Sequence, residues 1–259
     1  MITDEQSGRL LVSYNADTPW PLASITKLMT ALVVLEHNPG WNKIIRLQKA
    51  DEVEGARLRV ATGTPLTVRE ALNITLIGSA NNTANAIARS TGLTRKQFVA
   101  RMNAKAKKMG MNNTVFVEPS GIDPANVSTA HDVAILAKAA LGNATLQPIF
   151  RTKQYRWYNR NTKQHHTIKN TDTLLSASTI TVLAGKTGLL DESKANVAMR
   201  VSNGKHPLSI VVFGAQTLGN VFSIVEHAAQ WTWEAFQWKP QSARAVTTKP
   251  AARQKKTPY

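Results

Sequence analysis

The sequence of 259 residues contains no cysteine and no long hydrophobic run. The absence of cysteine leaves no thiol for an oxidising compartment to attack, which suits an exported protein. The longest apolar run, residues 28–35, is interrupted by Thr30 and is shorter than the roughly 18 residues that a membrane span needs, so we expect a buried helix there. The N-terminus lacks the basic and apolar regions of a secretory signal peptide, which leaves a cytosolic protein or the mature form of an exported one.

Acidic residues are scarce: 16 Asp and Glu stand against 32 Lys and Arg, giving a formal net charge of +16. The excess gathers in residues 95–108, in the acid-free stretch 133–171, and in residues 239–259, whose prolines and basic residues predict a disordered tail. Such regions attract nucleic acid, anionic lipid or acidic cell-wall polymers, and an ordinary solvated surface is an equal alternative. No nucleic-acid-binding module is found, so no specific nucleic-acid partner is expected.

Helix signals dominate the middle of the chain and strand signals its two ends. Thr67 with Glu70 and Thr94 with Gln97 form capping boxes, which predict that helices begin there. Other helices are expected at residues 24–37, 82–92, 129–141 and 221–236. Strands are expected at residues 2–3, 9–14, 179–183, 196–201 and 208–213, the last two joined by an Asn203-Gly204 turn.

This distribution predicts an α+β fold with one antiparallel sheet formed from both ends of the chain and flanked by helices. We expect a single domain over residues 1–238, with the sheet region at about 1–50 and 176–238. A mostly helical insert would occupy about 51–175. The active site would lie where the sheet and the insert meet.

Three short patterns follow one another along the chain: Ser-Ile-Thr-Lys at 24–27, Ser-Ala-Asn at 79–81 and Lys-Thr-Gly at 186–188. Each is weak alone, because Ser-x-x-Lys recurs at 202–205 and Ser-x-Asn at 13–15. Only the first set has the right order and local context. Together its members supply a nucleophile, an amine base, a polar relay and a cationic anchor, which indicates a serine acyl-transfer enzyme whose base is lysine.

Ser24 and Lys27 lie three residues apart in the first turn of an apolar helix, so they share a face. A serine at a helix start is often only a cap, but a lysine on a buried element is costly unless it has a purpose. Burial and a second cation would both lower the pKa of Lys27, so that its neutral amine accepts the Ser24 hydroxyl proton. Such general-base assistance accelerates reactions by roughly 10²–10⁴.

The other two patterns have ordinary explanations as well as catalytic ones. Ser79 would relay a proton to the leaving group and Asn81 would bind the substrate backbone, whereas the alternative is a polar interhelical loop. Lys186 and Thr187, at the end of a strand, would bind a carboxylate, and Gly188 would leave room for substrate. The chain lacks the upstream glycines of a Walker motif and any metal-binding histidine spacing, so neither a nucleotide nor a metal site is predicted.

The sequences around these patterns resemble the low-molecular-mass penicillin-binding proteins, the D-alanyl-D-alanine carboxypeptidases and endopeptidases of peptidoglycan. The resemblance covers roughly residues 1–238 and is closest to the endopeptidase branch. It is carried by Ala-Ser-Ile-Thr-Lys-Leu-Met-Thr-Ala at 23–31, Gly-Ser-Ala-Asn-Asn at 78–82, Ala-Gly-Lys-Thr-Gly at 184–188, and family-like stretches at 109–114, 119–123 and 126–130.

The resemblance implies a β-lactamase/transpeptidase-like fold and an acyl-enzyme formed on Ser24, with Lys27 as base and water as the final acceptor. Backbone N–H groups of Ser24 and Leu189 would form the oxyanion hole. Lys186 and Thr187 would hold the terminal carboxylate of a peptidoglycan stem peptide or of a β-lactam. No metal or organic cofactor is implied. The implied location is the periplasm or cell wall, with electrostatic association to anionic wall polymers or a membrane surface.

One departure from the family concerns the residues after Lys-Thr-Gly, where an aromatic or histidine and then threonine are usual but Leu189 and Leu190 stand here. A backbone donor survives this change, whereas side-chain contacts to substrate differ, so we expect altered preference or reduced activity. Two alternatives stay open. One is a class A-like β-lactamase with Glu118 driving deacylation. The other is a non-catalytic peptidoglycan-binding or signalling homologue.

Overall fold

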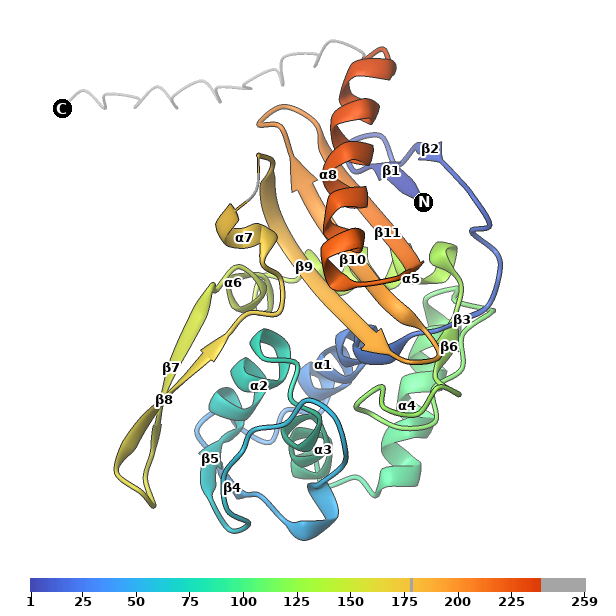
Figure 1. Ribbon diagram of the computed structural model, residues 1–259. Coiled ribbons are helices and arrows are strands. Elements are labelled where there is room, and N and C mark those ends of the chain that lie inside the picture. Colours follow the sequence, from blue (N-terminus) through green and yellow to red (C-terminus); the bar gives the residue numbers. More distant parts are fainter. Residues whose placement is uncertain (178, 239–259) are drawn as a thin grey trace, which may run out of the picture.

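A five-stranded antiparallel sheet built from both ends of the chain organises the computed structural model, which describes residues 1–177 and 179–238 (Figure 1). The order of its strands is β2 (Leu10–Val12), β1 (Ile2–Asp4), β11 (Pro207–Ala215), β10 (Lys194–Ser202) and β9 (Thr181–Leu190). The predicted Asn203-Gly204 turn joins β10 to β11. The tail predicted at 239–259 lies outside the described residues, and the single domain over 1–238 stays a prediction.

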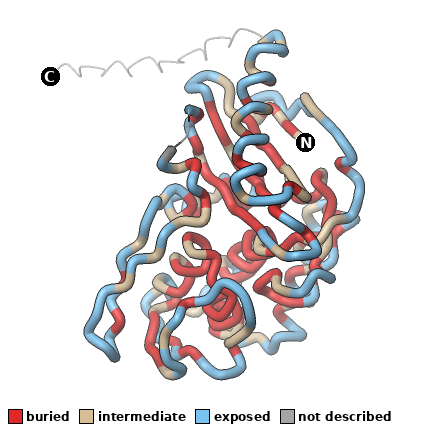
Figure 2. The backbone as a smooth tube through the Cα atoms, in the orientation of Figure 1, coloured by how far each residue is buried: buried red, intermediate tan, exposed pale blue. Residues whose placement is uncertain are grey.

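Helices cover both faces of the sheet. On one face α8 (Leu218–Ala235) packs Val221, Phe222 and Val225 onto alternate residues of β10 and β11. On the other face the sheet contributes to a larger core shared with α1 (Thr26–Glu36) and α5 (Ala130–Leu141). Figure 2 shows the sheet and the helices behind it as the mainly buried part of the molecule. Because side chains alternate along a strand, successive residues of β9 face these two different cores.

The helical part begins with the 3₁₀ turn η1 (Ala23–Ile25), which leads into α1. The predicted capping box at Thr67 is confirmed: its hydroxyl accepts from the Glu70 N–H at 3.1 Å, and the Glu70 carboxylate accepts from the Thr67 N–H at 2.7 Å. The box at Thr94 is confirmed as well. The remaining helices are α2 (Val68–Ile77), α3 (Asn81–Ser90), α4 (Arg95–Lys108), α6 (Gln147–Phe150), α7 (Leu174–Ala177) and the 3₁₀ turn η2 (Lys49–Asp51).

The region expected to be mostly helical also contains a β-hairpin, which the sequence patterns did not predict. Its strands β7 (Gln154–Asn159) and β8 (Gln164–Lys169) pair in antiparallel register and pack against α2. Trp157 and Asn159 are buried while their neighbours are exposed, the alternation typical of a strand with one buried side. Two shorter antiparallel pairs are formed by β3 (Trp20–Pro21) with β6 (Val127–Ser128) and by β4 (Ile44–Arg46) with β5 (Pro65–Thr67).

The strand that carries Lys-Thr-Gly is longer than predicted. The motif lies inside β9 rather than at its end, because β10 pairs with β9 as far as Leu190. Because β9 is the last strand of the sheet, only one of its two backbone edges pairs with another strand of that sheet, β10. Within the described residues, no helix is both long enough and apolar enough to cross a lipid bilayer.

Candidate active site

The turn that carries Ser24 is fixed by close backbone packing. Ala23 adopts a positive φ of 50°, and the Leu22 N–H donates to the Asn126 carbonyl at 2.8 Å. Two glycines press against this turn: a Cβ on Gly121 would lie 2.0 Å from the Ala23 carbonyl oxygen, and one on Gly188 would lie 2.8 Å from that of Leu22. Both positions therefore require glycine. Because its turn is held on two sides, the half-buried Ser24 side chain has a fixed position.

Lys27 is fully buried on α1 and points at the Ser24 hydroxyl. Its Nζ lies 2.7 Å from Ser24 Oγ, 2.6 Å from Asn81 Oδ1 and 2.5 Å from the Ser120 carbonyl oxygen. An ammonium donates all three hydrogens to these oxygens. A neutral amine has two hydrogens and one lone pair, so it can donate to Asn81 and Ser120 while accepting the Ser24 proton. The arrangement thus accommodates both protonation states of a general base.

The electrostatic surroundings of Lys27 favour the neutral amine. Burial lowers its pKa well below that of an ordinary lysine, and the nearby Lys186 ammonium lowers it further. The Glu118 carboxylate raises the pKa of Lys27, and its effect is the smallest of the three. A lysine with a lowered pKa has a larger unprotonated fraction at neutral pH, which is the form that can accept a proton.

The loop at Glu118 supports Lys27, a role that the sequence did not predict, since Glu118 was considered there only as the deacylating residue of a β-lactamase. Its buried carboxylate accepts the Ser120 N–H and hydroxyl, both at 2.6 Å, the Asn126 side-chain amide at 2.6 Å, and the Gly121 N–H. These four bonds shape the loop so that the Ser120 carbonyl meets Lys27. The family-like stretch 119–123 marked this loop in the sequence without indicating its contact with Lys27.

Lys186 forms a second cluster on the face of β9 that looks toward the helices. Its buried Nζ donates to Ser79 Oγ at 2.9 Å and to the Thr187 carbonyl at 2.8 Å, and the Thr187 hydroxyl bonds that of Thr171 at 2.6 Å. Ser79, between α2 and α3, has a positive φ of 59°, a strained conformation that recurs at functional sites.

Asp172 belongs to the same cluster, and sequence reasoning missed it. Burial lowers the pKa of Lys186 to about 7, and the Asp172 carboxylate acts in the opposite direction. Burial also raises the pKa of Asp172 to about 6. Lys186 therefore changes its charge near neutral pH, and Asp172 favours its cationic form.

The structure brings the predicted site residues together and gives three of them contacts within the protein that the sequence did not predict. Asn81 uses both ends of its amide within the protein, since Nδ2 donates to the Glu54 carbonyl at 2.8 Å and Oδ1 accepts from Lys27. Gly188 makes room for the Ser24 turn, and its role toward substrate stays a prediction. Ser79 contacts Lys186, not the Ser24 pair. The Leu189 side chain is 54% exposed.

The duplicate patterns lie elsewhere. Ser202 and Lys205 belong to the β10–β11 turn, where the Ser202 hydroxyl accepts the Gly204 N–H. Ser13 and Asn15 are exposed after β2. Among the described side chains, no group of three or more His, Asp or Glu residues is arranged to hold a metal ion.

Comparisons with known proteins agree with this arrangement. The family model described as D-alanyl-D-alanine carboxypeptidase matches residues 1–217. The D-alanyl-D-alanine endopeptidase of Pseudomonas aeruginosa is 34% identical over 217 residues, covering 83% of this chain and 70% of the relative. That of Haemophilus influenzae is 33% identical over 225 residues, covering 86% and 75%. The crystal structure of the Streptomyces K15 DD-transpeptidase has a TM-score of 0.82 at 27% identity, covering 90% of this chain and 95% of the other.

These matches place the fold in the class shared by penicillin-binding DD-peptidases, which confirms the predicted α+β architecture. The chain belongs to the D-alanyl-D-alanine carboxypeptidase family. The predicted resemblance and the predicted class of serine-type D-Ala-D-Ala carboxypeptidase or endopeptidase are confirmed.

Proposed function

We propose that this protein is a serine DD-peptidase that cleaves D-alanyl bonds of peptidoglycan through an acyl-enzyme on Ser24. The observation that carries the proposal is the contact of Lys27 Nζ with the Ser24 hydroxyl at 2.7 Å, with two further acceptors for the amine. No other acid or base contacts the hydroxyl among the described residues. A buried, neutral lysine is therefore the base that this geometry supplies.

In the proposed mechanism Ser24 Oγ attacks the carbonyl carbon of the scissile D-alanyl bond and its proton passes to Lys27. The carbonyl oxygen becomes an oxyanion facing the backbone N–H groups of Ser24 and Leu189, where one donor contributes about 2.7–4 kcal/mol. The Lys27 ammonium then gives this proton to the leaving amine, with the Ser79 hydroxyl as the relay, and Lys27 becomes neutral again; Ser79 Oγ itself accepts a hydrogen bond from Lys186. Water then attacks the ester carbonyl and gives a proton to the neutral Lys27, the bond from the carbonyl carbon to Ser24 Oγ breaks, and Lys27 returns the proton to Ser24 Oγ as the released acid departs.

Lys186 and Thr187 would hold the terminal carboxylate of the substrate, and this contact predicts a pH effect. With a Lys186 pKa of about 7, binding weakens as pH rises through that value and the ammonium is lost. Asp172→Asn removes the carboxylate that raises this pKa, so the alkaline limb of the kcat/KM profile should move to lower pH. At pH 8 we expect KM to rise about threefold to tenfold, with a smaller change in kcat.

The matched control for this prediction is Asp191→Asn, which removes an exposed carboxylate just after β9. Steady-state kinetics from pH 5 to 9 on a synthetic D-Ala-D-Ala peptide compare the two variants. An alkaline limb that stays in place in Asp172→Asn would show that Asp172 does not act on substrate binding through Lys186.

Labelling by a fluorescent penicillin tests the proposed function directly. A β-lactam carries a strained amide and a carboxylate, so it should acylate Ser24 and remain attached while hydrolysis is slow. The wild-type protein and Ser202→Ala, which alters the duplicate pattern, should both be labelled. Ser24→Ala should give no band on a denaturing gel and no added mass. Absence of label on folded wild-type protein would favour the non-catalytic homologue.

A chromogenic β-lactam separates this proposal from a β-lactamase. The Glu118 carboxylate already accepts four hydrogen bonds from the protein, so it is not free to activate a deacylating water. We expect a burst of about one equivalent followed by slow turnover. Fast multiple turnover would support the β-lactamase alternative instead.

The relatives named as endopeptidases favour a crosslink as the scissile bond. Digestion of crosslinked and uncrosslinked muropeptides, followed by mass analysis, distinguishes crosslink cleavage from removal of a terminal D-alanine. We further propose an extracytoplasmic location and electrostatic attraction to anionic wall polymers or a membrane surface. Exposed cations on α4 and on the β7–β8 hairpin support this attraction: Arg95, Lys96, Arg101, Lys107, Lys108, Arg156, Lys163 and Lys169.

A further inference from the structure

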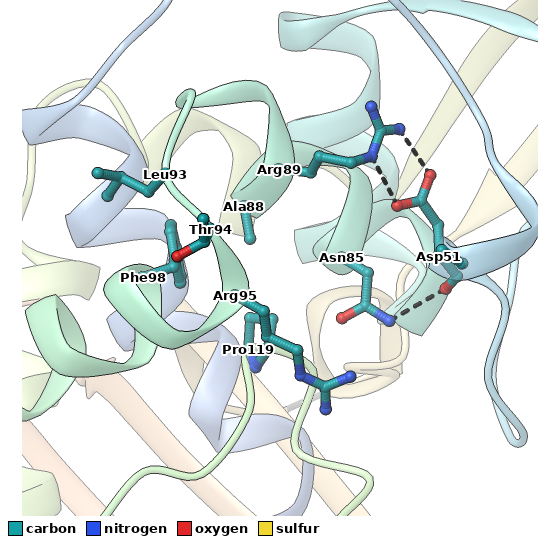
Figure 3. A pocket seen from close by; sticks show the side chains of 10 residues that line it. Asp51, Asn85, Ala88, Arg89, Leu93, Thr94, Arg95, Phe98 and Pro119 are labelled. Carbon is teal, nitrogen blue, oxygen red and sulfur yellow. Dashed lines mark hydrogen bonds and ion pairs between the residues drawn. The ribbon is translucent and has the colours of Figure 1, made fainter.

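A pocket separate from the catalytic groups lies between the end of α3, the beginning of α4 and Pro119 (Figure 3). Its volume is about 380 Å³, within the range of about 300–1,000 Å³ typical of small-molecule sites. Neither Ser24 nor Lys27 nor Lys186 lines it. The pocket is therefore a site in its own right, to which the proposed peptidase mechanism assigns no role.

The pocket contains a buried hydrogen-bond acceptor without a protein donor. Asn85 is only 9% exposed, and its Nδ2 donates to the Asp51 carbonyl at 3.0 Å. Its Oδ1 receives no hydrogen bond from any described residue. Figure 3 shows this amide oxygen turned away from Asp51, toward the side of the pocket where Arg95 and Pro119 lie. A buried acceptor left without a donor costs about 1–3 kcal/mol, so a ligand N–H or O–H would be favoured here.

The two arginines at the pocket differ in whether their positive charge is already paired with a carboxylate of the protein. Arg89 is neutralised by Asp51 through two hydrogen bonds, from Nε at 3.0 Å and from the terminal nitrogen at 2.7 Å. Arg95 is exposed, and no carboxylate of the described residues pairs with it. Arg95 is also the first residue of α4, where the helix dipole adds positive potential. An anionic group is therefore attracted to this end of the pocket.

The remaining walls are apolar, formed by Ala88, Leu93, Phe98 and Pro119. We propose that the pocket binds an N-acylated amino acid or the carboxyl end of a short peptide. The amide N–H would donate to Asn85, the carboxylate would pair with Arg95, and an apolar side chain would lie against Phe98. A phosphate brings acceptors where Asn85 needs a donor, and a free amino acid brings an ammonium near two arginines, so both fit less well.

Binding of N-acetyl-leucine, in both enantiomers, to the Ser24→Ala variant tests the proposal by calorimetry. The amide derivative lacks the carboxylate and the N-methyl derivative lacks the N–H donor, and each is expected to bind about tenfold more weakly. Arg95→Gln in the same background should weaken binding of the acid about tenfold and leave binding of the amide derivative unchanged. Lys96→Gln, which removes a neighbouring charge outside the pocket, is the control and should bind as before.

Three results would overturn the proposal: no binding of the acid at concentrations on the order of 10 mM, equal affinities in Arg95→Gln and Lys96→Gln, or equal affinity for the N-methyl derivative. The experiment needs no turnover, because it uses the Ser24→Ala variant. Penicillin labelling of the wild-type protein reports on the catalytic proposal alone, so the two can fail independently.

Discussion

Replacing Lys27 by methionine is expected to lower the rate constant for acylation of Ser24 by about 10²–10⁴. Methionine approximates the length of lysine without its amine, so the Ser24 hydroxyl would lose the only base in contact with it among the described residues. To measure the rate, the protein is mixed with a fluorescent penicillin, the reaction is stopped at increasing times, and the labelled protein is quantified. Circular dichroism checks that the variant is folded.

A second substitution separates proton transfer from charge. Lys27→Arg keeps a cation near Ser24, but a guanidinium does not lose its proton in proteins, so acylation should be about as slow as in Lys27→Met. Lys205→Met, which changes the exposed lysine of the duplicate pattern, should be labelled at the wild-type rate. Fast labelling of the arginine variant would show that Lys27 supplies positive charge rather than a base.

Replacing Gly121 by alanine is expected to destabilise the protein by about 3 kcal/mol or more and to abolish labelling of Ser24. The added Cβ would lie 2.0 Å from the Ala23 carbonyl oxygen, and Gly121 has a φ of 82° that alanine adopts poorly. The turn before Ser24 and the Glu118 loop would have to separate. Urea denaturation at equilibrium measures the change in the free energy of unfolding.

Gly204→Ala isolates the contribution of backbone conformation. Gly204 has a similar φ of 90°, but a Cβ added there would meet nothing within 4 Å, so only the conformational cost of about 1–2 kcal/mol applies. The difference between the two variants therefore reports the steric contact at Gly121. Equal losses of stability would mean that the Gly121 loop moves aside easily and that its packing does not fix Ser24.

Signals that depend on neighbouring residues were sufficient to predict the longer helices, the β10–β11 turn and the Ser24–Lys27 pair, but not the short α6 and α7. The capping boxes at Thr67 and Thr94 are examples, because the donor and acceptor lie three residues apart in the chain. The strand signals at the two ends of the chain, on either side of a mostly helical middle, led to the antiparallel sheet formed from both ends.

Contacts between distant residues could not be obtained in this way. The bond from Lys27 to the Ser120 carbonyl spans 93 positions, and the residues next to either partner contain no pattern that predicts the contact. The bond from Lys27 to Asn81 is equally non-local and was not predicted, and the binding of substrate by Asn81 stays a prediction. The β7–β8 hairpin was missed because its alternation is short and lies between helices.

The pairing of β1 with β11 limits how early the sheet can form during synthesis of the chain. Ile2 of β1 pairs with Ile210 of β11, so this edge of the sheet cannot form until β11 has left the ribosome. Lys186, too, reaches Ser79 only once β9 has been made. A nascent chain that already carries Ser24 and Lys27 thus still lacks the contact between Lys186 and Ser79, and we expect covalent capture of penicillin to count only molecules in which β9 has joined the sheet.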